Sequence, residues 1–167
     1  FHPMYAQLSG AYKTENEDII QSVVYGYGII CQRCAKDEFN KVKEQVLTGI
    51  VTVMQREVNE DNEITYDNSI GALGKYLYYQ SPTDENGLTM TIQFIKLLPL
   101  KHDLEEGKAV CKEFFAQIKQ ENKLIVNEQT IPLIKDAIKR ISEHNEKEHF
   151  LEEEEVALRE VMSKLGM

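Results

Sequence analysis

The chain has 167 residues, a formal net charge of −9, 42% hydrophobic residues and 28% charged residues. This balance is typical of a folded domain or of a few stacked repeats. The acidic charge argues against a general nucleic-acid binder and against docking on an anionic membrane, because both depend on Lys and Arg. It is compatible with basic protein partners, and equally with solubility alone.

No apolar run approaches the roughly 18–20 residues needed to span a bilayer, and no signal peptide is recognisable. Because the chain begins with Phe1, we expect it to be a piece of a longer protein. Its three cysteines make an odd number without a disulfide framework, which indicates a reducing compartment.

Residues 1–14 carry loop signals and are expected to be a loop or the end of a preceding element. A long helix is predicted over about 15–34, followed by a second over about 38–58 with Asp37 as its cap. The first has a buried face at helical spacing, made of Ile19, Ile20, Val23, Val24, Tyr27, Ile30, Cys31 and Cys34.

The stretch 65–99 predicts two more helices, the first ending at Ser81-Pro82 and the second at Pro99. Cap or first-turn positions are assigned to Asp67, Asn68 and Ser69. An acidic linker, 59–63, precedes this pair. One helix pair cannot bury its own apolar surface, so similar pairs are expected on either side.

A third pair is predicted over 103–143, with helices over about 104–122 and from near residue 129. The residues expected to face inward are Ala109, Val110, Phe114, Phe115, Ile118, Ile131, Ile134, Ile138 and Ile141. Residues 145–148 read as a polar break, and 148–167 as a terminal capping helix with Glu152 to Glu155 at its start.

The sequence therefore predicts an all-α fold of three helix pairs (15–58, 65–99 and 103–143) and a capping helix. Aligning Gly28, Gly74 and Phe114 gives offsets of about 46 and 40 residues, which fit the HEAT or armadillo period of roughly 40–47. The predicted architecture is a HEAT-repeat superhelix, or solenoid.

Three segments resemble the importin beta (karyopherin beta) superfamily, in the family's order. Residues 24–32, Val-Tyr-Gly-Tyr-Gly-Ile-Ile-Cys-Gln, resemble a helix near the C-terminus of these receptors. Residues 67–75, Asp-Asn-Ser-Ile-Gly-Ala-Leu-Gly-Lys, resemble the helix of the next repeat, and 95–106 resemble the junction that follows. The chain is most similar to the importin five type, although the tryptophans of the third motif are missing.

This resemblance implies a nuclear transport receptor that shuttles between cytoplasm and nucleus. The implied partners are protein cargo with basic signals, the phenylalanine-glycine (FG) repeats of nucleoporins, and the GTPase Ran. The family's main Ran contact lies in N-terminal repeats outside this segment, so Ran is expected to act through the full-length receptor. The alternatives are a HEAT scaffold of a phosphatase or chromatin complex, and a helical-bundle enzyme.

Tyrosines are the first candidate for a partner site. Three lie within the four positions 76–79, and at a helical spacing of about 100° they cannot all face the core. Tyr25 lies off the main apolar stripe of the preceding repeat, so Tyr25 with Tyr76 or Tyr79 could line a groove between neighbouring helices. Such a groove accepts a nucleoporin phenylalanine in the resembled family; the alternative is packing between repeats.

The acidic residues before and between the helices are the second candidate, and Glu60, Asp61 and Glu63 represent them. They could meet a basic cargo or form a solvated surface. Catalytic, cofactor and metal sites are not predicted. The Cys31-x-x-Cys34 pair closes a helix and has no second ligand pair, which favours buried, neutral thiols.

Overall fold

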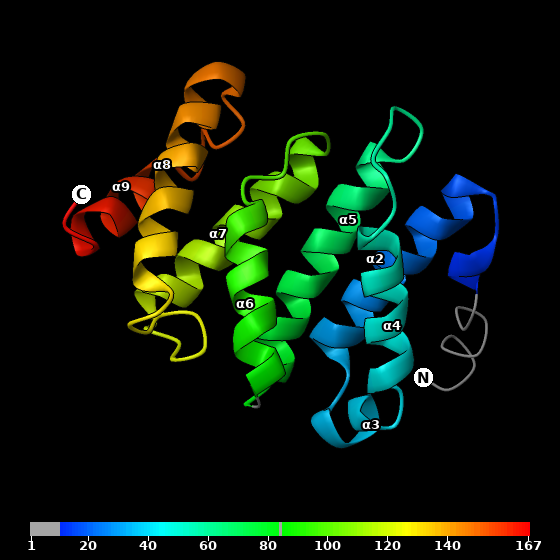
Figure 1. The fold of residues 1–167 in the computed structure, drawn as a ribbon. Coiled ribbons are helices and arrows are strands. Elements are labelled where there is room, and N and C mark those ends of the chain that lie inside the picture. The colour runs from blue at the N-terminus through cyan, green and yellow to red at the C-terminus, as the bar shows by residue number, and fades with distance from the viewer. Residues whose placement is uncertain (1–10, 84) are drawn as a thin grey trace. The chain divides into compact units, whose positions relative to one another are not determined.

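The computed structural model describes residues 11–83 and 85–167, and the regular structure within them is entirely helical. The chain divides into two compact units, Phe1–Gln80 and Ser81–Met167 (Figure 1). The boundary falls between the two helices of the predicted 65–99 pair. Most of the predicted loop over 1–14 lies outside the described residues; within it, Ala11–Lys13 (η1) forms one 3-10 turn. None of the described helices is long and apolar enough to cross a membrane.

After η1, the first unit contains α2 (Glu17–Arg33), α3 (Lys36–Asn40), α4 (Lys43–Met54), α5 (Glu63–Lys75) and the π-helical turn η2 (Tyr76–Gln80). The predicted first helix is confirmed as α2. The side chain of Asn16 caps it by accepting a hydrogen bond from the backbone N–H of Ile19 at 3.2 Å. Two details of the predicted buried face are wrong: Ile19 is exposed, and Cys34 follows the helix and is half-buried.

The predicted helix over 38–58 is wrong as a single element, because it is broken into α3 and α4. Val42, a β-branched residue with weaker helix preference, adopts a non-helical conformation between them, with φ −123° and ψ −3°. Asp37 is not a cap; it lies in the first turn of α3. The break allows Phe39 to reach the core, where it is 1% exposed.

The predicted caps of the next helix are also wrong. Helix α5 begins at Glu63, so Asp67, Asn68 and Ser69 lie inside it, and all three are buried. Buried polar side chains need hydrogen-bond partners. Asn68 donates to the carbonyl of Ile64 at 2.9 Å, and Ser69 donates to that of Tyr66 at 2.6 Å. The predicted stop is confirmed: η2 ends at Gln80, and Ser81 has a positive φ of 43° before Pro82.

In the first unit, α2 and α5 pack side by side and run parallel, with α4 antiparallel to both. The parallel direction follows from residue pairs that advance together along both chains: Gly28 meets Ala72, and Gln32 donates to Tyr79. The antiparallel direction of α4 follows from the ion pair between Arg56, just after α4, and Glu17 at the start of α2. Three helices thus alternate in direction along the chain, as stacked hairpins do.

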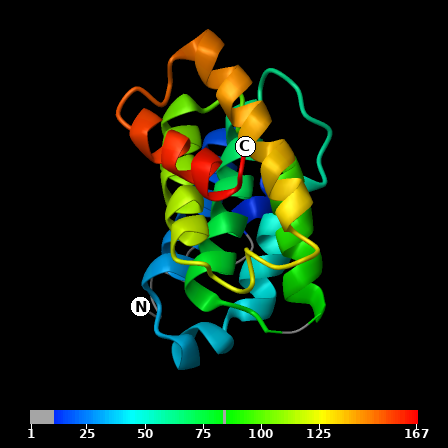
Figure 2. The same ribbon diagram turned by 90° about the vertical axis from the view of Figure 1, so that its left-hand side faces the viewer.

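The second unit contains α6 (Glu85–Leu97), α7 (Leu104–Lys119), α8 (Ile131–Glu148) and α9 (Glu155–Lys164). Asp103 caps α7 by accepting from the backbone N–H of Glu106 at 2.9 Å. Phe94 and Phe114 meet edge to face in the core, with ring centroids 6.2 Å apart. Helix α9 advances in the same sense as α7 but crosses it at an angle, because Lys108 pairs with Glu153 just before α9 and Lys119 with Glu160 within it (Figure 2).

Several predictions for this unit need correction. Ala109 was expected to face inward but is exposed, and Cys111 is buried on the inner face instead. Ile131 is only half-buried, whereas the other residues predicted to face inward are confirmed. These are Val110, Phe114, Phe115, Ile118, Ile134, Ile138 and Ile141.

The predicted polar break over 145–148 is wrong, because α8 continues to Glu148 and ends at His149, with a left-handed φ of 52°. Asn145 faces inward and accepts a hydrogen bond from the buried N–H of Leu151 at 2.7 Å. Its polar side chain therefore fixes the next turn rather than ending the helix. Of the predicted N-terminal acidic run 152–155, only Glu155 lies within α9.

The connection between α7 and α8 has its own buried anchor, which the helix pattern did not predict. Ile125 is fully buried within this loop. Thr130, also fully buried, donates its hydroxyl to the Ile125 carbonyl at 2.6 Å and accepts from the N–H of Asn127 at 3.0 Å. These bonds hold the loop closed over Ile125 before α8 begins.

Side-chain hydrogen bonds between second-neighbour helices recur at a similar sequence separation in both units. In the first unit the separations are 47 residues for Gln32 to Tyr79 and 49 for Gln80 to Cys31. In the second, they are 44 for Arg140 to Lys96 and 41 for Lys119 to Glu160. Each unit therefore places helices beside one another whose contacting residues lie 41 to 49 positions apart in the sequence.

Candidate functional site

The exposed tyrosines lie along the line where α2 meets α5 and η2. Helices α2 and α5 approach closely at Gly28, where an added Cβ would lie 3.4 Å from Ala72 Cα and 3.2 Å from Lys75 Cδ. Glycine therefore leaves room for the aliphatic stem of Lys75 to cross from α5 towards α2.

Tyr25, Lys75 and Tyr79 lie along the line where α2 meets α5 and η2, and we call these three residues the tyrosine strip. The ammonium of Lys75 lies 5.4 Å from the centroid of the Tyr25 ring, within cation–π range. Further along, Gln32 Nε2 donates to the Tyr79 hydroxyl at 3.2 Å. Tyr25 is 50% exposed and Tyr79 42% exposed. Both tyrosine predictions are thus compatible with a partner-binding surface.

Tyr76 does not belong to this surface. It is 2% exposed, and its ring packs against that of Phe39 with centroids 5.8 Å apart. Its prediction as an exposed groove residue is therefore wrong. Tyr78 is also buried, so the expectation that at least one of the three tyrosines faces outward is met by Tyr79 alone.

The π-helical turn η2 brings Gln80 against the end of α2. The Gln80 side chain is 5% exposed, and its Nε2 donates to the carbonyls of Cys31 at 2.7 Å and Cys34 at 3.1 Å. These bonds satisfy carbonyls at the end of α2 that have no partner within the helix. Gln80 thus ties η2 to α2 next to Tyr79, and Gln32 holds the Tyr79 hydroxyl. Neither glutamine nor Lys75 was assigned to the site from sequence, although Lys75 lies four positions before Tyr79.

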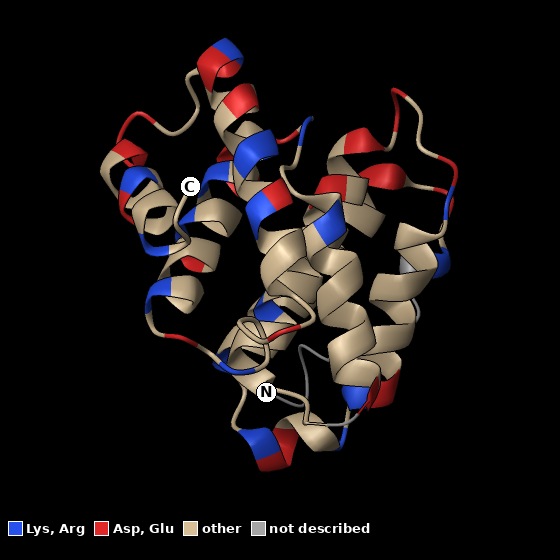
Figure 3. Cartoon of the chain, turned by 60° about the vertical axis from the view of Figure 1, so that its left-hand side comes forward, with Lys and Arg blue, Asp and Glu red and all other residues tan. Residues whose placement is uncertain are grey.

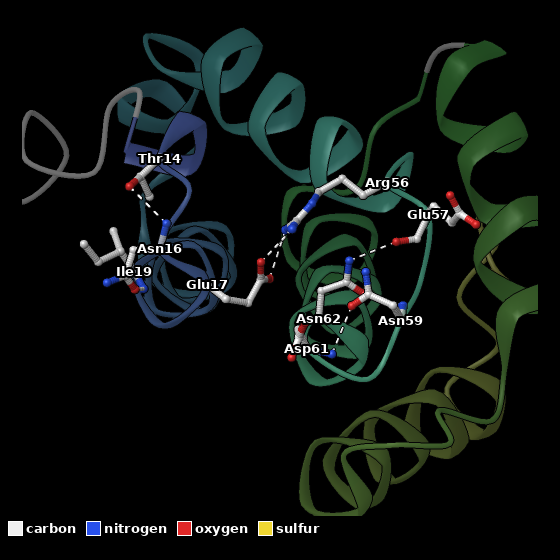
Figure 4. Close-up of polar contacts among 9 residues, drawn as sticks. All are labelled: Thr14, Asn16, Glu17, Ile19, Arg56, Glu57, Asn59, Asp61 and Asn62. Atoms are coloured by element: carbon white, nitrogen blue, oxygen red, sulfur yellow. Dashed lines mark hydrogen bonds and ion pairs between the residues drawn. The ribbon is translucent and has the colours of Figure 1, made fainter.

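The acidic candidates lie at the other end of the same helices, in and after the α4–α5 loop (Figure 3). Glu60 and Asp61 are exposed, and Glu63 is half-buried in the first turn of α5. The loop is ordered by its asparagines: Asn62 accepts from the N–H of Asn59 at 2.9 Å and donates to the Glu57 carbonyl at 2.9 Å (Figure 4). The three acidic candidates are neighbours in the sequence, in and just after the loop, and the tyrosine strip lies further along the same helices.

An ion pair links the end of α4 to the start of α2, near the acidic candidates. Arg56 donates through both terminal nitrogens to Glu17, at 2.9 Å and 2.6 Å (Figure 4). The hydrogen bond from Arg56 is the main cause that lowers the pKa of Glu17; Thr65 of α5 adds a second hydrogen bond, while burial opposes both. The same bond raises the pKa of Arg56. Glu17 therefore joins α2, the end of α4 and the start of α5.

This geometry predicts a pH-dependent contribution to stability. The pKa of Glu17 is below its ordinary value of 4.5 in the folded state. Its contribution is therefore complete above about pH 4.5 and is lost as the pH falls through the folded-state pKa. We expect Glu17→Gln to cost about 1 kcal/mol of unfolding free energy at pH 7, since both partners are partly exposed. The cost should shrink as the pH falls below 4.5, because Glu17 is then protonated first in the unfolded state and, at lower pH, in the folded state as well.

Urea unfolding of both proteins at several pH values measures this difference. The matched control is Glu15→Gln, an exposed carboxylate beside the same helix start. A cost for Glu17→Gln that stays constant with pH would show that the ion pair does not stabilise the fold.

The cysteines are protonated in this fold. Burial raises the pKa of the Cys31 and Cys111 thiols to about 12 each. The pKa of Cys34 is raised by burial and then by the charge of Glu38. Nucleophilic and metal-binding cysteines act as thiolates, so these positions do not favour such chemistry. Among residues 11–83 and 85–167, no group of three or more His, Cys, Asp or Glu side chains is placed to hold a metal ion.

The first unit therefore offers two surfaces of different chemistry. One is the tyrosine strip, which includes the cation Lys75. The other consists of Glu60, Asp61 and Glu63, which we call the acidic loop. Comparison of the chain with protein-family models, curated proteins and solved structures gives no match.

Proposed function

We propose that this chain is a HEAT-repeat segment of an importin-beta-like nuclear transport receptor and that it works by binding proteins rather than by catalysis. The observation that carries the proposal is the recurrence of hydrogen bonds at separations of 41 to 49 residues, from α2 to η2, from α6 to α8 and from α7 to α9. Equivalent helices of neighbouring HEAT repeats pack beside one another at such a separation.

The sequence resemblance supports the transport reading over a different HEAT scaffold. Its first segment, 24–32, lies in α2, and its second, 67–75, lies in α5. Gly28 of the first segment meets Ala72 of the second, so the small residues of both are used where the helices approach most closely. Under this proposal the stack is a curved superhelix that moves between cytoplasm and nucleus and meets Ran through the full-length receptor.

Two kinds of partner fit the surfaces of the first unit. The exposed rings of Tyr25 and Tyr79 suit the phenylalanine side chains of nucleoporin FG repeats, because aromatic pairs gain energy beyond the area they bury. The exposed carboxylates of Glu60 and Asp61, with Glu63, suit cargo with basic signals. Individual contacts of either kind are weak, so a transport receptor would combine several.

The test is a fluorescence-anisotropy titration of the whole 167-residue chain with two labelled peptides, one containing FG repeats and one rich in lysine. We expect saturable binding of the FG peptide, weakened at least about twofold by Tyr79→Ala, because an aromatic pair contributes about 0.5–1.5 kcal/mol. Val156→Ala, which removes an exposed apolar side chain from α9, is the control and should change nothing.

The lysine-rich peptide should lose affinity on Glu60→Gln combined with Asp61→Asn, without any effect of Tyr79→Ala. The transport function would be contradicted if neither peptide shows saturable binding at concentrations up to about 1 mM, which corresponds to a binding free energy of about −4 kcal/mol. A HEAT scaffold of a phosphatase or chromatin complex would then be the better assignment.

A further inference from the structure

Lys75 is the cation of the tyrosine strip. Its ammonium lies over the Tyr25 ring at 5.4 Å, and its stem lies against the backbone at Gly28. Tyr79 follows four positions later and is tied to α2 through Gln32. A group that packs on the Tyr25 ring therefore lies close to the positive charge of Lys75.

The strip offers no depth in which an aromatic ring could insert between the helices. At Gly28, even a Cβ would lie within 3.4 Å of both Ala72 Cα and Ala72 Cβ, so the α2–α5 seam is closed at that level. An incoming ring must lie on the surface, against Tyr25 or Tyr79, and its neighbours in the peptide remain close to Lys75. The chemistry of those neighbours then matters as much as the ring.

The charge around the strip differs from that at the opposite end of the unit. Lys75 is in the last turn of α5, and Arg33 is in the last turn of α2. The first turns of the same helices carry Glu17 and Asp18 in α2 and Glu63 in α5. Because α2 and α5 are parallel, their basic last turns point in one direction and their acidic first turns in the other, although Lys75 lies beside Gly28 rather than beside Arg33.

From this arrangement we propose that the tyrosine strip selects peptides in which an aromatic residue is adjacent to Asp or Glu. The ring packs on Tyr25 or Tyr79, and the neighbouring carboxylate accepts a charge-assisted hydrogen bond from the Lys75 ammonium. The inference rests on the proposed function, since it uses the same strip, and it assigns Lys75 as the residue that sets peptide specificity. Basic cargo is directed to the acidic loop instead.

The test uses three peptides that differ at one position: acetyl-Gly-Ser-Phe-Glu-Ser-Gly-amide and the same peptide with Gln or Lys in place of Glu. We expect the Glu peptide to bind the wild-type chain about threefold to fivefold more tightly than the Lys peptide, as for the stronger exposed ion pairs, with the Gln peptide between them. The difference should shrink at about 500 mM salt, where the screening length falls to a few ångström.

Lys75→Met keeps the aliphatic stem over Gly28 and removes the charge. In this variant the Glu and Lys peptides should bind within about twofold of each other, as expected without the ion pair. Lys139→Met, which removes an exposed lysine of α8, is the matched control and should preserve the full preference.

The outcomes separate the two proposals. Equal binding of all three peptides to the wild type, with loss on Tyr79→Ala, would overturn the role of Lys75 and leave the aromatic site intact. A preference that survives Lys75→Met would also overturn it, because another cation would then select the peptide. Binding of none of the three, or no effect of either Tyr25→Ala or Tyr79→Ala, would contradict the strip as a peptide site altogether.

Discussion

Replacing Phe114 by Ala is expected to lower the free energy of unfolding by about 3–5 kcal/mol, the range measured for buried Phe to Ala changes. Phe114 is fully buried in the middle of α7, and its ring meets that of Phe94 edge to face. The substitution removes the ring, leaves a cavity, and deletes an aromatic pair that contributes beyond its buried area.

Urea denaturation followed by circular dichroism measures this loss. Lys112→Ala is the control on the same helix: Lys112 is 68% exposed and pairs with Glu154 at 3.2 Å, a contact expected to contribute at most about 0.5–1 kcal/mol. A loss at Phe114 no greater than at Lys112 would show that α7 does not pack as described.

The second large effect is expected at Gly28. Gly28→Leu should destabilise the chain by about 2–3 kcal/mol, as overpacking of a close contact does. A Cβ alone would meet Lys75 Cδ at 3.2 Å and the Ala72 backbone at 3.4 Å, so the larger side chain must force α2 and α5 apart. Lys75 is flexible and can move, but the backbone of Ala72 cannot do so without disturbing the interface.

Ser22→Leu provides the comparison, because Ser22 lies on the exposed face of α2 and the added side chain meets water. We expect this control to change stability by no more than about 0.5 kcal/mol. If Gly28→Leu is equally mild, the close approach of α2 and α5 is incorrect, and with it the register that brings Tyr25 and Lys75 together.

Helical periodicity predicted most of the fold because apolar residues at helical spacing mark one buried face. The inner face of α2, with Val23, Val24 and Tyr27, was identified in this way, and so was that of α8. Local signals failed where tertiary contacts overrode them. Asp67, Asn68 and Ser69 look like capping residues in sequence, but their side chains are buried inside α5, and hydrogen bonds to carbonyls one turn earlier satisfy Asn68 and Ser69.

The candidate site was predicted only in part, because local helix geometry and tertiary contacts decide which of the tyrosines are exposed. Tyr76 and Tyr79 are three positions apart, which places them on one face of a regular helix. The π-helical turn η2 widens the spacing at this point, so Tyr76 faces Phe39 while Tyr79 is exposed. A π-turn has no simple sequence signal, and neither does the contact of Lys75 with Tyr25 across two helices.

The acidic loop illustrates the opposite case. Glu60 and Asp61 were expected at a helix connection, and they lie there and are exposed, because charged residues between helices remain in water. The bonds that order the loop depend on Asn59 and Asn62, whose side chains act on the backbone nearby.

The central claim is that the tyrosine strip binds aromatic side chains, and residue-resolved NMR tests it most directly. The isotopically labelled 167-residue chain would be titrated with an unlabelled FG-repeat peptide. We predict saturating shift changes at the amides of Tyr25, Lys75 and Tyr79 and their neighbours in α2 and η2, lost in Tyr79→Ala. Shift changes confined to the second unit or to the acidic loop, or no change with saturation, would contradict the account.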